Sequence, residues 1–173
     1  LLSAMLLPII AVSAQSDRAL FHLPSPSGSF LAGQEAFNTL STREAAQAFL
    51  DATDTQWDNP EVIQRAYAAL IADGRIEDGV VLARRSLELD PGDNLARLVL
   101  GTVALKERRY TSSIKQLAPM GLENFVDIAG AVVHAWALVG QGSLNEAFGV
   151  LEDLGNDGLK SFLIFHRALM ADF

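Results

Sequence analysis

The chain has 173 residues, a formal net charge of −8 and no cysteine, which excludes disulfides and thiolate metal sites. Its 13 basic residues are outnumbered by 21 acidic ones, so we expect no nucleic-acid partner, because a phosphate backbone would be repelled. Alanine and leucine supply 51 residues, and both favour helices. The composition therefore predicts an all-α protein.

The N-terminal segment LLSAMLLPIIAVSA carries no charge and ends in Val12-Ser13-Ala14, which matches the site that a signal peptidase reads. This pattern predicts that residues 1–14 are the remnant of a signal peptide and that the protein is exported to the periplasm or cell envelope. An ordinary N-terminal core helix is the alternative. Residues 15–25 are polar and contain proline, which predicts a flexible lead-in.

A fixed period runs through the rest of the chain. Small residues recur at Ala45, Gly79, Ser113 and Ala147. Two further columns with the same spacing are Gly33, Tyr67, Gly101 and Ala135, and then Phe49, Ala83, Leu117 and Leu151. Small residues at a fixed place indicate that two helices approach closely there, and a period of about 34 residues indicates a repeat architecture.

Each period contains two helical patterns. From Glu61 to Asp73 the apolar residues have the spacing of an amphipathic helix, and Gly74 ends that pattern. A second pattern runs from Ile76 to Leu89 and stops at the turn sequence Asp90-Pro91-Gly92-Asp93. One helix pair cannot bury its apolar face alone, so neighbouring pairs must stack into a solenoid.

The period and its columns resemble the tetratricopeptide repeat (TPR) family. The resemblance is carried by Gly74 to Gly79 followed by Leu87 to Pro91, by Leu100-Gly101 and by Ala32-Gly33. It implies an all-α, right-handed solenoid of helix-turn-helix repeats. The implied repeats are residues 26–59, 60–93, 94–127 and 128–161, with residues 162–173 as the start of a truncated fifth repeat in a longer exported protein.

Four positions depart from the family pattern. Tyr67 stands where a small residue is usual, and Gly79 replaces alanine. Pro119 and Gly121 should end the second helix of the third repeat early, because proline cannot continue a helix.

Side chains that carry chemistry do not assemble into a catalytic pattern. The histidines are His22, His134 and His166, and they lack metal-ligand spacing on one helix face. Ser112 and Lys115 have the Ser-x-x-Lys spacing of penicillin-recognising enzymes, but the partner motifs are absent. Gly140-Gln141-Gly142 follows no strand, so it is interpreted as a turn. We expect no catalytic residue, metal or cofactor.

Two predicted first helices, within residues 95–105 and 126–139, are apolar almost all round, whereas a surface helix has one apolar stripe. The resemblance implies that first helices line a concave groove, and that this groove is apolar, with Trp136 as a natural anchor. The predicted groove residues are Phe30, Phe37, Ile71, Leu95, Leu98, Leu105, Val132, Trp136 and Val139. The lysine and asparagine clamp with which some TPR grooves hold a carboxylate is absent.

An apolar groove suits an amphipathic helix or an apolar peptide. We therefore predict a non-enzymatic adaptor or scaffold in cell-envelope or periplasmic assembly. Its predicted partner is a protein or peptide, and whether that partner lies near the membrane is left open. Downstream repeats of the same chain are the alternative occupant of the groove. The rival functions are a TPR arm of a larger enzyme and a carrier of a lipid or acyl chain.

Overall fold

The computed structural model describes residues 25–155 and 157–173, which form α-helices and one short 3-10 helix. The predicted signal-peptide remnant and most of the lead-in therefore lie outside the described residues. The elements are α1 (Pro26–Asn38), α2 (Thr42–Thr53), α3 (Pro60–Ala72), α4 (Ile76–Leu89), α5 (Asn94–Lys106), α6 (Tyr110–Leu117), α7 (Phe125–Gln141), α8 (Leu144–Asp153), η1 (Asp157–Leu159) and α9 (Lys160–Asp172). This arrangement confirms the predicted all-α class of packed helix pairs.

Helix starts follow the repeat period closely. The second helices of the pairs begin at Thr42, Ile76, Tyr110 and Leu144, and each start lies one period after the one before. Among the first helices, α7 differs because it begins three residues ahead of the period. The side chain of Asn124 caps α7 by accepting hydrogen bonds from the backbone N–H groups of Val126 and Asp127, at 2.9 and 3.1 Å.

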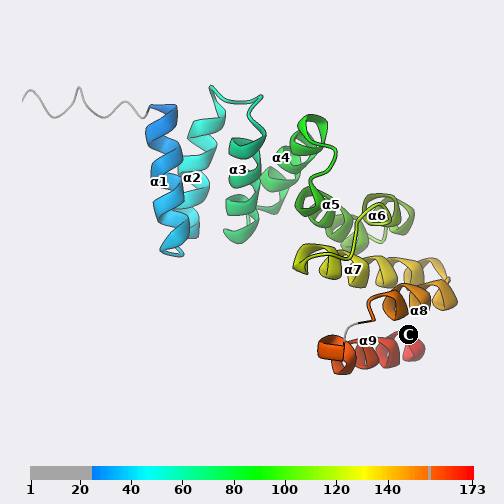
Figure 1. The fold of residues 1–173 in the computed structure, drawn as a ribbon. Helices are drawn as coiled ribbons and strands as arrows, with labels where there is room; N and C mark the ends of the chain where they lie inside the picture. The colour runs from blue at the N-terminus through cyan, green and yellow to red at the C-terminus, as the bar shows by residue number, and fades with distance from the viewer. Residues whose placement is uncertain (1–24, 156) are drawn as a thin grey trace, which may run out of the picture.

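The array turns along its length. In Figure 1, α1 to α4 stand side by side, whereas α7 to α9 run nearly across them, with α5 and α6 in between. The described interior has two apolar clusters. One extends from Ala45 to Ala96, and the other extends from Ala131 to Met170. None of the helices in the described ranges is long and apolar enough to cross a membrane.

A small residue on one helix of a pair faces a larger residue on the other helix, and the second pair has the two in the opposite order. A Cβ atom on Gly33 would lie 2.9 Å from the Phe49 ring, and one on Gly101 would lie 2.6 Å from Leu117 Cγ. The second pair reverses this order, because the fully buried Tyr67 occupies the position of Gly33 and Ala83 occupies that of Phe49. The total volume between the helices is thus maintained, as close packing requires.

The third pair has the early break that Pro119 predicts. Helix α6 ends at Leu117 and has eight residues, whereas α4 has fourteen. Met120 follows the break and packs over α7, where a Cβ atom on Gly130 would lie 2.5 Å from Met120 Cε. A methionine side chain therefore fills part of the space that a longer α6 would occupy.

The turn inside each pair uses one left-handed residue. Leu40, Gly74, Arg108 and Gly142 are each separated by one period and have φ values of 59°, 82°, 59° and 91°. Glycine adopts this conformation without strain, whereas leucine and arginine do not. The repeat geometry therefore imposes the same backbone on four different sequences.

Candidate functional site

In the N-terminal half, the predicted groove residues pack within the helix pairs. The Phe30 and Phe37 rings both contact the Phe49 ring edge-to-face, with centroids 5.5 and 6.5 Å apart. Ile71 packs against Gly79 of α4, where a Cβ atom would lie 2.6 Å from Ile71 Cδ1. These three side chains are half-buried and hold α1 to α2 and α3 to α4 together.

The remaining predicted residues line or approach the interior of the array. Leu95 packs against the N-terminal apolar cluster, and Leu98 and Leu105 are half-buried on α5. Val132 is 8% exposed and belongs to the C-terminal cluster, against which Val139 packs. Val132 is therefore the one buried member of the predicted set, and the other eight residues are half-buried.

Trp136 is partly covered by the chain's own last helix. Its indole Nε1–H donates a hydrogen bond to Nδ1 of His166 on α9, at 3.0 Å. The Phe173 ring lies edge-to-face with the indole, with centroids 6.2 Å apart. Helix α9 therefore occupies part of the surface that Trp136 would otherwise offer to a partner.

A pocket of about 240 Å³ remains beside Trp136, where α5 and α7 end. Its lining combines aromatic, aliphatic and cationic residues. These are Leu105, Lys106, Arg108, Tyr110, Trp136, Gly140 and Phe173. The pocket brings together two of the predicted groove residues, Leu105 and Trp136.

Helix α9 carries the largest accumulation of exposed apolar side chains in the described ranges. The exposed residues are Phe162 at 45%, Ile164 at 59%, Phe165 at 60%, Leu169 at 43% and Phe173 at 86%. The opposite side of α9 packs on the C-terminal cluster through Leu163 and the buried Met170. The sequence pattern placed this segment in a first-helix register but gave no sign that its apolar face would stay exposed.

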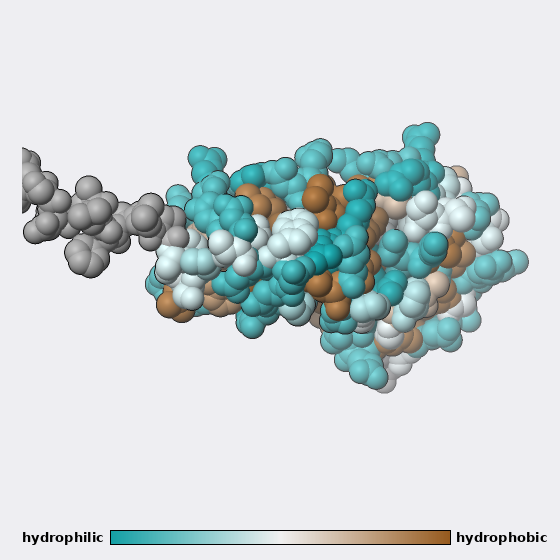
Figure 2. Space-filling view, turned by 90° about the horizontal axis from the view of Figure 1, so that it is seen from above, coloured by the Kyte–Doolittle hydropathy of each residue, from teal (hydrophilic) through white to brown (hydrophobic). Residues whose placement is uncertain are grey.

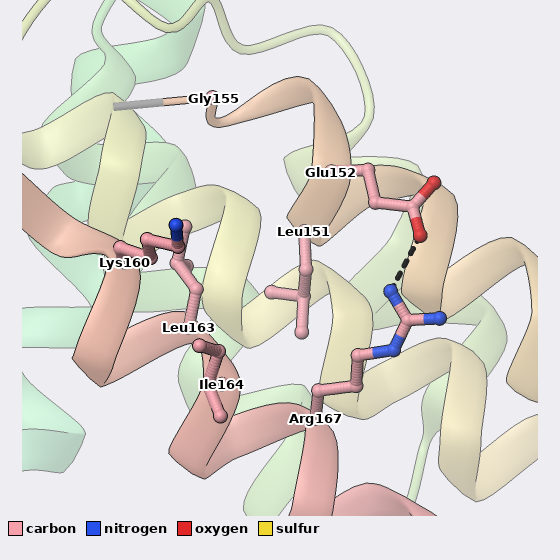
Figure 3. A pocket seen from close by; sticks show the side chains of 7 residues that line it. All are labelled: Leu151, Glu152, Gly155, Lys160, Leu163, Ile164 and Arg167. Atoms are coloured by element: carbon pink, nitrogen blue, oxygen red, sulfur yellow. Dashed lines mark hydrogen bonds and ion pairs between the residues drawn. The ribbon is translucent and has the colours of Figure 1, made fainter. Parts of the chain in front are cut away.

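A second pocket, of about 290 Å³, lies between α8 and the start of α9. Figure 3 shows Leu151, Leu163 and Ile164 at its centre, with Lys160 on one side and Arg167 on the other. Arg167 forms an ion pair with Glu152. No ion pair of Lys160 occurs within the described residues. The pocket offers an apolar floor with one available cation.

The face seen in Figure 2 differs from the surface of α9. Hydrophilic residues predominate there, and hydrophobic residues appear in patches between them. A continuous apolar surface is therefore not a general property of the molecule.

Groups with shifted pKa values do not form a reaction centre. Burial lowers the pKa of His134, an effect that Glu146 opposes, and burial also lowers the pKa of His166. Within the described ranges, no cluster of three histidine, aspartate or glutamate side chains is placed to hold a metal. Ser112 and Lys115 are exposed on α6, whereas Ser113 is buried and donates its hydroxyl to the Gly101 carbonyl at 2.8 Å.

Comparison with known proteins shows the fold. The structure is similar to a solved structure described as "MamA RS-1 ArsTM double mutant", with a TM-score of 0.68 and 19% sequence identity over 84% of this chain and 82% of that one. MamA is a TPR-repeat protein, so the match confirms an all-helical TPR-like repeat fold. No protein-family model matches the sequence, and no curated protein matches it.

Proposed function

We propose that this TPR-like array is a non-enzymatic scaffold that binds a helical or apolar segment of a partner protein. The observation that carries the proposal is the exposed apolar side of α9, which continues past Phe173 to the pocket beside Trp136. Exposed apolar surface of this kind marks interaction sites in folded proteins. The proposed surface is therefore the C-terminal part of the array rather than the whole first-helix groove.

Packing supports this restriction. Phe30, Phe37 and Ile71 are half-buried and pack within their own helix pairs. By contrast, Phe162 and Phe165 project from α9 with about half of their surface exposed. Aromatic residues supply large contact areas at low entropic cost and are enriched at interfaces.

A photo-crosslinking experiment tests the scaffold function. A benzophenone side chain at Phe162 is expected to capture a discrete partner in the native extract, whereas the same group at exposed Glu88 of α4 is not. The captured partner, once purified, should bind the unmodified protein with a Kd of roughly 1 µM or below, the range of a specific complex. Equal capture at both positions, or none at Phe162, would contradict the proposal.

A role in cell-envelope assembly is proposed from the sequence of residues 1–14. Fractionation followed by N-terminal sequencing tests this part separately. We expect the mature protein in the envelope or periplasmic fraction with Gln15 at its N-terminus.

A further inference from the structure

A pocket of about 200 Å³ lies where the second helix pair meets the third. Each of the three helices that enclose it contributes two residues four positions apart, which therefore lie on one face of that helix. These residues are Val80 and Arg84 of α4, Leu100 and Ala104 of α5, and Ser112 and Gln116 of α6. The three helices follow one another in the middle of the array (Figure 1), so the pocket has helix pairs on both sides.

The floor of the pocket is aliphatic. Val80 and Ala104 are buried, at 8% and 2% exposed, and Leu100 and Val103 are half-buried. No aromatic side chain is among the lining residues that the structure describes. Pockets for drug-sized ligands measure roughly 300–1,000 Å³, so this one suits a smaller molecule. The floor therefore fits a short aliphatic chain better than a ring system.

Two arginines from different parts of the fold also line the pocket. Arg109, which precedes α6, forms an ion pair with Glu107. Arg84 of α4 forms no ion pair with any residue that the structure describes. Ser112 adds a hydroxyl and Gln116 adds an amide to the lining. The pocket thus places guanidinium, hydroxyl and amide donors beside an aliphatic floor.

The charge around the pocket favours a singly charged anion. Residues 94–117 contain five basic residues and one acidic residue, although the whole chain has a net charge of −8. A positive region of this kind raises the local concentration of anions. Within the pocket, Glu107 neutralises Arg109, which leaves the positive charge of Arg84 uncompensated. One negative charge on a ligand would balance it.

We propose that this pocket binds a short aliphatic carboxylate. Arg84 pairs with the carboxylate, because the guanidinium fork matches the two oxygens of a carboxylate. The aliphatic chain lies on the floor formed by Val80, Leu100 and Val103. Inorganic phosphate would satisfy the arginine but would leave this floor in contact with water. The site lies apart from α9 and does not depend on the scaffold function.

Ligand-observed NMR titration of the full chain with acetate, butyrate and hexanoate tests the proposal. For hexanoate we expect a Kd of roughly 1 mM, in the range open to a ligand of so few atoms. Affinity should rise by up to about fourfold for each methylene, the effect of about 0.8 kcal/mol per buried CH₂ group. Hexanamide has the same chain without the charge and should bind about tenfold more weakly, because it loses the hydrogen bonds of a charged group.

Two variants test the role of the arginine. Arg84→Gln should weaken hexanoate binding about tenfold through the same loss. The Arg84 side chain is exposed, so the variant should keep its fold, which circular dichroism checks. The matched control is Lys115→Gln, which removes the same charge from an exposed side chain of α6 that does not line the pocket. It should change the affinity by less than about twofold, because solvent screens exposed charges.

Several outcomes would overturn the proposal. These are equal binding of hexanoate and hexanamide, an equal loss of affinity in the two variants, and tighter binding of inorganic phosphate than of hexanoate. The peptide acetyl-Ala-Ala-Leu with a free carboxylate distinguishes two sources of the same chemistry. Tighter binding of this peptide than of hexanoate, lost in Arg84→Gln, would support the site and assign the carboxylate to the end of a polypeptide. Weaker binding of the peptide would support a free acid.

Discussion

The Tyr67 hydroxyl donates to both carboxylate oxygens of Asp93, at 2.8 and 3.0 Å, in the buried joint between the second and third helix pairs. Asp93 also accepts hydrogen bonds from the Ser86 hydroxyl at 2.6 Å and from the Ala96 backbone N–H at 3.1 Å. Its carboxylate therefore caps α5 while binding α3 and α4. Burial and the adjacent Asp93 charge raise the pKa of Tyr67 above its ordinary value, so the hydroxyl keeps its proton and remains a donor.

Removal of this hydroxyl should destabilise the protein. Tyr67→Phe leaves the ring in place but takes the hydroxyl's shared hydrogen bond from a carboxylate that is 5% exposed. We expect the free energy of unfolding to fall by about 1.5–3 kcal/mol, the contribution of hydrogen bonds to charged groups. Urea denaturation measures this change. Tyr110→Phe is the control and should have a much smaller effect, because the Tyr110 hydroxyl makes no hydrogen bond among the described residues.

The left-handed turn residues offer a stabilising change. Leu40→Gly and Arg108→Gly remove a side chain from a backbone conformation that costs L-residues roughly 1–2 kcal/mol. Glycine offsets part of this gain through its greater unfolded-state entropy, so a net increase of about 0.5–1 kcal/mol is expected. Thermal melts of each variant test this. Gly74→Ala, at a φ of 82°, should change stability in the opposite direction.

The contact between a small and a large residue within each pair predicts energetic coupling. Gly101→Ala would place a Cβ atom 2.6 Å from Leu117 Cγ and should cost about 1–3 kcal/mol through overpacking. Leu117→Ala alone leaves a cavity. In the double variant each defect relieves the other, so the two costs should sum to more than the measured loss. A double-mutant cycle from urea unfolding gives the coupling, and simple additivity would contradict close packing at this position.

Acidification should weaken the contact between Trp136 and α9. The pKa of His166 is lowered from its ordinary 6.5 by burial, so the folded state favours the neutral ring, whose Nδ1 accepts the indole N–H. This stabilising contribution is complete above pH 6.5 and is lost as the pH falls through 6.5 toward the lower folded-state pKa. The Trp136 indole N–H resonance should shift with a midpoint below pH 6.5.

Trp57 provides an internal control for that titration. Its ring lies 5.8 Å from the Arg85 guanidinium, which stays charged throughout this range. Its indole resonance should stay nearly constant. A His166→Gln variant should abolish the pH response of Trp136, and a response that persists in this variant would assign the titration to another group.

The repeat period was enough to predict the class of fold. Pro119 was enough to predict that α6 ends early. Recurring small and apolar columns record the close approach of helices, and proline removes a backbone donor from the next turn. The start of α7 did not follow the period, because local capping by Asn124 extends that helix. The start of a helix depends on a few hydrogen bonds in its cap. It can therefore differ from the start that the repeat period predicts.

The candidate site was less predictable than the fold. Apolarity on a first helix does not distinguish a side chain that packs inside its pair, such as Phe37, from one that faces a ligand. The coverage of Trp136 depends on the placement of His166, which lies on a different helix and far along the sequence. Long-range packing of this kind leaves no periodic pattern, so the surface on α9 emerged only from side-chain exposure.

The two apolar clusters of the interior have a consequence for how the array comes apart. In a linear array each unit is stabilised by its own contacts and by those with its neighbours. The clusters end at Ala96 and begin again at Ala131, and a hydrogen bond from Asn94 to Asp127 at 2.7 Å joins α5 to α7 between them. Native-state hydrogen exchange should therefore reveal two cooperative units. The amides of α7 and α8 would lose protection together while those of α3 and α4 stay protected. The C-terminal unit would thus unfold while the N-terminal unit stays folded.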